Sequence, residues 1–203
     1  MPIDPFLVAG RLAPDAILAY HTALEFHGKA HSPMHGFYYL TGLAARPLGF
    51  RDQRFRAVRS PAALRSKGAE LSNVVDGERM GLSVRVTNLE RTMVDVLDRP
   101  HFGGGWEEIW RSLESVEFFD FDAVVEYALL LDNATTIAKV GFFLEQHKDS
   151  LMVEERHLEP LRKRRPRAPH YLSRGARRPG KLAAGWNLVV PAEVLERRWE
   201  EVT

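Results

Sequence analysis

Apolar residues at helical spacing dominate the second half of the chain, from Thr87 to about residue 165. Four successive segments there each carry an apolar stripe on one face, which is typical of amphipathic helices that pack against a core. A fifth helix is predicted over about residues 154–164. Thr87 and Glu90 have the spacing of a capping box, and Arg99-Pro100 predicts the end of the first helix.

The shorter apolar runs of residues 36–86 are typical of β-strands. An aromatic run at 37–41 lies between two glycines, and arginines at 54, 56 and 59 alternate with apolar residues, so we expect them to face water. Asp76-Gly77 predicts a hairpin turn between two further strands. These features together predict an antiparallel sheet.

Shorter elements flank these two regions. Pro5 suits the first turn of a helix at residues 5–8, and a second helix is predicted from Asp15 to about His27. Residues 167–185 are predicted to form a loop, 186–190 a strand and 191–201 a closing helix. We therefore expect one α+β domain over residues 1–203, in which the antiparallel sheet (36–86) packs with a helical bundle (87–165) and a basic tail, strand and helix follow (166–203).

The composition of the 203 residues limits the kinds of site and the cellular compartment that we expect for the protein. There is no cysteine, which excludes disulfides, thiolate metal sites and cysteine nucleophiles. Neither a signal peptide nor a run of about 20 apolar residues is present, so the sequence predicts a cytoplasmic protein without membrane contact.

Charge is distributed in blocks, although the net charge is only +1. Residues 46–67 carry a net +6, residues 68–155 a net −11, and residues 156–185 a net +9. Blocks of this kind favour a local anion-binding face, with nucleic acid the usual ligand. The alternative is that acidic and basic segments pack beside each other, so that their charges cancel.

Arginine-rich runs in the last basic block are the best functional candidates. Guanidinium groups bind phosphate through fixed pairs of donors, and His170 and Tyr171 between the runs offer stacking surfaces. The alternative is a solvated tail. The predicted nucleic-acid-binding residues are Arg162, Lys163, Arg164, Arg165, Arg167, Arg174, Arg177 and Arg178.

Other patterns give weaker candidates. Gly103–Gly105 precede a helix and could hold a phosphate, but Glu107 and Glu108 follow and would repel an anion. Four histidines between His21 and His35, with Glu25 one helical turn after His21, do not complete a metal-ligand motif. We therefore predict no metal and no cofactor.

Glu90 and Asp95 suggest a catalytic carboxylate pair, but they are five residues apart and do not share a helix face squarely. A capping role for Glu90, with Arg91 tying the helix to the sheet, is the favoured interpretation. The sequence therefore predicts no catalytic residue.

Several segments resemble the AbiEi family of bacterial antitoxins, over nearly the whole chain. The most specific is Arg85–Asp95, which is similar to the family's V-T-x-x-E-R-T-x-x-D segment. The family-motif residues carried over are Thr87, Glu90, Arg91, Thr92 and Asp95, with Tyr20 and His21 from the Ala19–Glu25 stretch. The remaining similar segments are Pro5–Ala9, Gly104–Glu108 and Lys139–Glu145.

The resemblance implies an antitoxin and transcriptional autoregulator of a type IV toxin–antitoxin pair. Such proteins counter a nucleotidyltransferase-like toxin without forming a stable complex with it. The family usually begins with a winged helix-turn-helix, for which there is no room before Pro5 here. Without that module we expect DNA binding to be weak or non-specific.

Two further functions stay open beside a non-enzymatic regulator. A nuclease or modifying enzyme predicts that Glu90, Asp95 and His21 converge in a cleft with perturbed pKa values. A protein-interaction module predicts a large exposed apolar patch.

Overall fold

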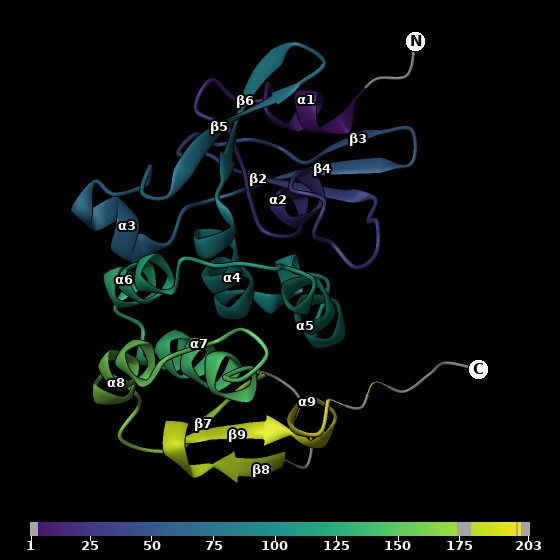
Figure 1. Ribbon diagram of the computed structural model, residues 1–203. Coiled ribbons are helices and arrows are strands. Elements are labelled where there is room, and N and C mark those ends of the chain that lie inside the picture. The colour runs from purple at the N-terminus through teal and green to yellow at the C-terminus, as the bar shows by residue number, and fades with distance from the viewer. Residues whose placement is uncertain (1–3, 174–179, 198, 200–203) are drawn as a thin grey trace. The chain divides into compact units, whose positions relative to one another are not determined.

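The computed structural model describes residues 4–173, 180–197 and 199. The chain divides into two compact units, of which the first ends at Phe119 and the second begins at Asp120. Both units combine helices with a β-sheet (Figure 1). The predicted α+β class is therefore confirmed.

A six-stranded sheet organises the first unit, in the order β3-β4-β2-β1-β6-β5. The sheet is mixed, which corrects the predicted antiparallel arrangement, because β2 pairs with β4 and β1 with β6 in parallel. Its strands are β1 (Ile17–Leu18), β2 (Gly36–Leu40), β3 (Leu48–Phe50), β4 (Gln53–Val58), β5 (Val74–Arg79) and β6 (Leu82–Thr87).

The central strand β1 replaces the first part of the helix predicted from Asp15 to His27. Leu18 pairs with Tyr39 on one side and Val86 on the other, and all residues from Ala16 to Tyr20 are buried. Tyr20 has a φ of +58°, which no helical residue adopts, so the helix begins only at His21. An apolar run that is buried on both faces is compatible with either a strand or a helix. Here the run forms a strand because it pairs with a strand on each side.

The hairpin turn between β5 and β6 lies at Met80-Gly81 and not at the predicted Asp76-Gly77. Both turn residues have positive φ, +52° and +74°, as a two-residue loop of type I′ requires. Gly77 lies inside β5, where a Cβ would come within 2.5 Å of the ring of Phe26. The glycine is therefore needed for close packing.

Helices cover the sheet of the first unit, and the rings of Phe6, Phe37 and Phe55 lie in the core between them. Asp4 caps the first helix by accepting hydrogen bonds from the backbone N–H groups of Phe6 and Leu7. The helices are α1 (Pro5–Ala9), α2 (His21–Phe26), α3 (Ala62–Lys67), α4 (Leu89–Asp98), the 3₁₀ helix η1 (Pro100–Phe102) and α5 (Trp106–Glu114).

The second unit packs its helices with a small sheet of order β7-β9-β8. The helices lie where the apolar spacing predicted them, and Asp120 and Asn133 cap the first two. Trp186 is fully buried against Gly141, at which a Cβ would meet the indole ring at 2.1 Å. The elements are α6 (Phe121–Leu131), α7 (Ala134–Gln146), α8 (Glu155–Lys163), β7 (His170–Tyr171), β8 (Gly180–Ala183), η2 (Ala184–Trp186), β9 (Leu188–Pro191) and α9 (Ala192–Leu195).

The C-terminal region differs from its prediction in detail. The stretch predicted as a loop contributes β7 and β8, and the strand predicted at 186–190 begins at Leu188. Within the described part of the chain, no helix is long and apolar enough to cross a bilayer.

Candidate nucleic-acid interface

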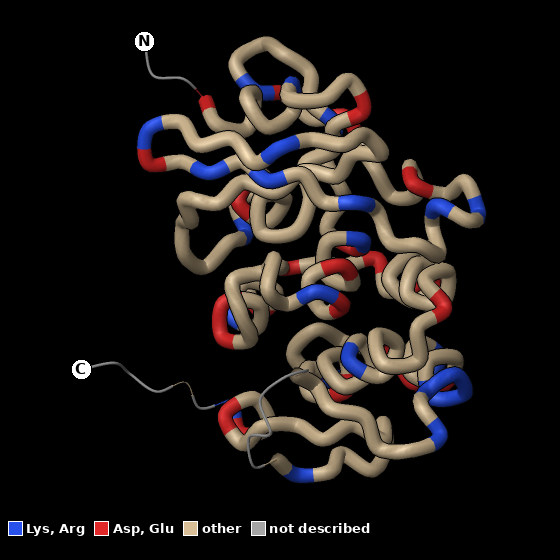
Figure 2. Tube along the Cα trace, turned by 180° about the vertical axis from the view of Figure 1, so that it is seen from behind, with Lys and Arg blue, Asp and Glu red and all other residues tan. Residues whose placement is uncertain are grey.

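The candidate interface is built at the C-terminal end of α8. Leu158 and Leu161 are buried, so they fix the helix in the second unit. Arg162 and Lys163 lie in its last turn, where cations complement the helix dipole. The run from Arg162 to Arg165 is a continuous blue segment in Figure 2, and Pro166 separates it from Arg167 in the following loop.

An open pocket of about 500 Å³ lies at this helix end. The pocket brings together four of the predicted nucleic-acid-binding residues, while Pro166 and Asn187 were not predicted because no sequence pattern links two positions so far apart. Its lining residues are Glu159, Arg162, Lys163, Arg165, Pro166, Arg167 and Asn187.

Neighbouring acidic side chains neutralise part of the positive charge of this pocket. Arg162 pairs with Glu145 at 2.5 Å and with Glu155, and its guanidinium lies 5.4 Å from the centre of the Trp186 ring. The hydrogen bond to Glu145 raises the pKa of Arg162 above its ordinary value. Arg162 is therefore first of all a structural residue.

The neighbouring cations are paired more loosely. Lys163 contacts Glu159 at 2.8 Å, and Arg164 lies 3.7 Å from Asp132, with all four side chains largely exposed. Exposed ion pairs of this kind contribute little to stability, so their basic side chains readily exchange one anionic partner for another.

Arg165 and Arg167 are the cations of the pocket that remain available. Both are exposed, and no acidic group of the described residues forms an ion pair with either. Asn187 shapes the site beside them by donating a hydrogen bond from Nδ2 to the carbonyl oxygen of Pro166 at 2.8 Å. Two unneutralised guanidinium groups at an open pocket are suited to bind phosphate oxygens.

The structure describes only part of the remaining predicted basic run. Arg174, Arg177 and Arg178 lie outside the described residues. His170 and Tyr171 form β7, so their side chains lie on opposite faces of the small sheet. His170 Nδ1 is 2.6 Å from Thr135 Oγ1, which holds the imidazole by one edge, whereas Tyr171 is 55% exposed and offers an open ring face.

The basic block at residues 46–67 belongs to the first unit. Arg54, Arg56 and Arg59 are exposed, as the alternation along β4 predicted. The guanidinium of Arg56 lies over the ring of Phe102, 5.5 Å from its centre.

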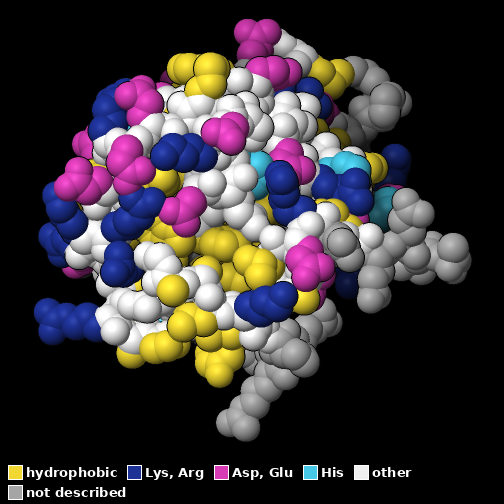
Figure 3. Space-filling view, turned by 60° about the horizontal axis from the view of Figure 1, so that its bottom comes forward, with side chains coloured by type: hydrophobic (Ala, Val, Ile, Leu, Met, Phe, Trp, Pro, Cys, Tyr) yellow, Lys and Arg dark blue, Asp and Glu magenta, His cyan; other side chains and the backbone are white. Residues whose placement is uncertain are grey.

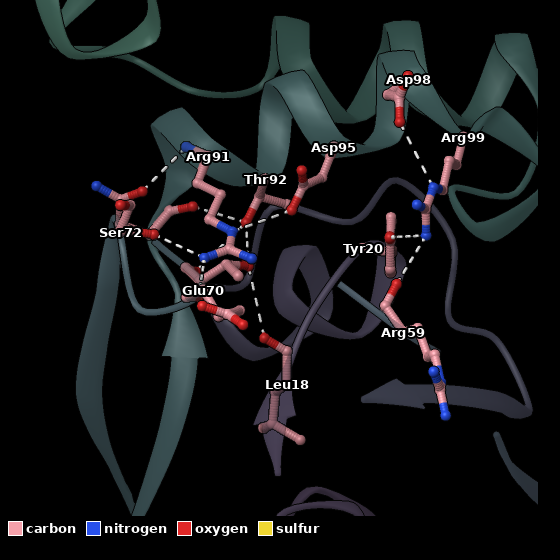
Figure 4. Close-up of polar contacts among 12 residues, drawn as sticks. Leu18, Tyr20, Arg59, Glu70, Ser72, Arg91, Thr92, Asp95, Asp98 and Arg99 are labelled. Carbon is pink, nitrogen blue, oxygen red and sulfur yellow. Dashed lines mark hydrogen bonds and ion pairs between the residues drawn. The ribbon is translucent and has the colours of Figure 1, made fainter. Parts of the chain in front are cut away.

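The buried Arg91 is the centre of the family-motif segment. Its Nη1 donates hydrogen bonds to the carbonyl oxygens of Glu70 and Ser72, each at 2.7 Å, and its Nε donates to Asp95 Oδ2 at 3.2 Å (Figure 4). Both charged side chains are fully buried. The arginine therefore ties α4 to the segment that enters β5, in agreement with the prediction that it joins helix and sheet.

The helix cap differs from the predicted capping box. Asn88 is the N-cap of α4, and its side chain accepts a hydrogen bond from the backbone N–H of Arg91. Thr87 is the last residue of β6, where its hydroxyl lies 2.7 Å from that of Thr92. The prediction was wrong by one position because Thr87 is taken up by strand pairing, and Glu90 is a half-buried residue of the first turn.

Tyr20 and Arg99 form a second tie between α4 and the sheet. Arg99 Nη1 donates hydrogen bonds to the hydroxyl of Tyr20 at 3.1 Å and to the carbonyl oxygen of Arg59 at 3.0 Å (Figure 4). Burial, and after it the nearby charge of Asp95, raises the pKa of Tyr20 well above its ordinary value. Tyr20 therefore stays neutral and structural.

His21 lies between two carboxylates. Nδ1 is 2.9 Å from Glu25 and Nε2 is 2.9 Å from Glu108, while the imidazole itself is fully buried. Burial acts to lower the pKa of His21, but the contacts with both carboxylates outweigh it and raise that pKa. The pair Glu25–His21 follows from helical spacing, whereas Glu108 was not predicted as a partner because it is 87 residues away.

The same carboxylates fasten the loop that follows α2. Glu108 accepts a hydrogen bond from the backbone N–H of Ser32, and Glu25 accepts one from that of Met34. His21 and Asp95 are thus each engaged with charged partners of their own. Among the described residues, no group of three or more histidine or acidic side chains has the geometry to hold a metal ion.

Gly103–Gly105 form the entry to α5, with positive φ at Gly104 and Gly105. A Cβ at Gly103 would meet Ile109 at 2.8 Å, so this glycine serves close packing. The structure therefore gives the glycine run a structural use.

Comparison with known proteins shows that this fold is shared by a solved structure. The chain is similar to the RV2827C protein from Mycobacterium tuberculosis, with a TM-score of 0.62, 17% sequence identity, and coverage of 97% of this chain and 71% of that protein. No family model and no curated protein matches the sequence. At this level of identity the similarity establishes a shared fold.

Proposed function

We propose that this protein is a non-enzymatic regulator of the AbiEi antitoxin type, which contacts nucleic acid through the basic pocket at the end of α8. The observation that carries the proposal is the placement of Arg165 and Arg167 at an open pocket without acidic partners among the described residues. Phosphate contacts of this kind give affinity without reading sequence. In this proposal the pocket anchors the chain on nucleic acid.

The state of the family-motif residues supports a binding function over catalysis. Asp95 is fully buried against Arg91, and His21 is held by two carboxylates. Catalytic acids and bases must reach substrate, whereas these side chains join elements of the fold. The role of an antitoxin against a nucleotidyltransferase-like toxin rests on the sequence resemblance.

The test is binding of the full chain to fluorescent DNA of its own upstream region and to random DNA, over a series of salt concentrations. We expect similar affinity for both and a steep fall with salt. The double variant R165A/R167A should reduce the magnitude of the slope of log K against log salt by about 2, because each phosphate contact contributes about 0.9.

A matched control is the double variant R46A/R54A, which removes the same charge from exposed positions of the first unit. It should bind as the unchanged protein does. No binding at low salt would exclude the nucleic-acid role, and a larger loss in R46A/R54A than in R165A/R167A would move the interface to the first unit. Rescue of cell growth from a co-expressed nucleotidyltransferase-like toxin tests the antitoxin role separately.

A further inference from the structure

The small sheet of the second unit has one covered face and one open face. Leu188 and Val190 of β9 are buried on the side where α7 and α9 pack. Val189 therefore lies on the opposite face. Figure 3 shows hydrophobic side chains gathered on the side of the molecule that carries this sheet.

An apolar row crosses the open face. Val189 is in register with Tyr171 of β7 and with Leu182 of β8, so the three side chains lie side by side. Tyr171 is 55% exposed and Leu182 is 50% exposed. The row thus presents one aromatic ring beside two aliphatic side chains.

The row and the basic pocket are joined by Asn187. Its side chain donates to the carbonyl oxygen of Pro166 in the pocket, and its own carbonyl accepts a hydrogen bond from the backbone N–H of His170 at 2.8 Å. Arg167 precedes Tyr171 by four residues, which span at most ~14 Å of extended chain. One ligand of a few nucleotides reaches both features.

The chemistry of the two features selects the ligand. Arginines bind the phosphates, and an exposed tyrosine ring stacks on a base only when that base is unpaired and turned outward. In a duplex the faces of the bases are already stacked on one another. A protein partner fits less well, because the row has three side chains, whereas a stable interface takes about 20–30 residues a side.

We propose that the row formed by Tyr171, Val189 and Leu182 is a stacking platform for unpaired bases, and that the basic pocket therefore takes single-stranded nucleic acid. This inference rests on the proposed function and narrows its ligand. Phosphate contacts at Arg165 and Arg167 supply most of the affinity, and the base on Tyr171 supplies the preference for single strands.

The experiment compares the full chain on a labelled 12-nucleotide strand, as DNA and as RNA, with the same sequence as a duplex. We expect tighter binding of at least one single strand. Tyr171→Ala should weaken single-strand binding by about 5- to 140-fold, the range for loss of one stacked base, and leave the salt slope unchanged. Tyr171→Phe and Tyr171→Trp should retain binding, because stacking needs the ring and not the hydroxyl.

A strand with 2-aminopurine provides a readout of stacking itself, since its fluorescence should fall on binding to the unchanged protein and recover in Tyr171→Ala. Phe118→Ala is the matched control, because Phe118 is an aromatic residue 77% exposed in the first unit. Equal binding of strand and duplex, or an effect of Phe118→Ala as large as that of Tyr171→Ala, overturns the platform and leaves the pocket in place. Absence of binding to every nucleic acid instead overturns the proposed function.

Discussion

The buried ion pair between Arg91 and Asp95 leads to a sharp prediction for Arg91→Ala. The change removes the partner of a fully buried carboxylate and also two hydrogen bonds, each 2.7 Å long, to the carbonyl oxygens of Glu70 and Ser72. Removing one partner of a buried pair costs about 3–5 kcal/mol, because a buried charge is left without compensation. Glu70 and Ser72 are themselves only half-buried, so we expect the lost hydrogen bonds to add little and the total loss to be about 4 kcal/mol.

Arg111→Ala is the matched control. Arg111 pairs with Glu107 across the same four-residue spacing at 2.9 Å, but the two side chains are 39% and 47% exposed. Exposed helical pairs contribute about 0.3–0.5 kcal/mol. The two variants thus remove the same residue type from the same kind of pair and differ in burial.

The assay is urea unfolding, monitored through the hydrogen exchange of peptides from residues 82–98. These peptides report on the first unit alone. With a slope of roughly 2 kcal/mol per molar urea, a loss of about 4 kcal/mol shifts the midpoint by about 2 M. The shift for Arg111→Ala should be about 0.2 M. The reasoning is refuted if the two variants lie within about 1 kcal/mol of each other.

Three further predictions concern other sites. The pKa of His21 is raised in the folded state, so protonation of His21 stabilises the fold. This contribution is complete below the ordinary pKa of 6.5 and is lost as pH rises through the folded-state pKa. The decline of the unfolding free energy above pH 6.5 should therefore be smaller in His21→Gln than in the unchanged protein. Gly141→Ala should lower the melting temperature at a cost of about 1–3 kcal/mol or more, because its Cβ would overlap Trp186; an unchanged melting temperature would contradict the tight packing. Met80→Asn should raise the unfolding free energy by up to about 1 kcal/mol, since Asn-Gly suits the positive φ of both turn residues; a loss in urea unfolding would argue against this turn.

Local patterns predicted the helices of this chain better than its sheets. The stripes of α4, α6 and α7 and the cap at Asp120 depend on neighbours within one turn, so the sequence contains the whole signal. The two-residue strand β1 depends on partners at Tyr39 and Val86, and no local pattern distinguishes such a strand from a helix start.

The candidate site shows the same division. The basic residues Arg165 and Arg167 are evident from composition, but the pocket they form depends on Asn187, which is 20 or more residues away in sequence. The role of Arg91 was predicted in kind, as a tie between helix and sheet, whereas its acceptors at Glu70 and Ser72 were visible only in the structure.

The brevity of β1 has a consequence for the order of folding. This strand joins the β3-β4-β2 group to the β6-β5 hairpin, yet it pairs with β6 at Leu18 and Val86, about 70 residues apart. Closing a loop of that length costs about 4 kcal/mol of chain entropy, whereas the two flanking groups need only short loops. We expect both groups to form first and the pairing of β1 with β6 to form last, so substitutions that weaken this pairing at Leu18 should accelerate unfolding more than they slow folding.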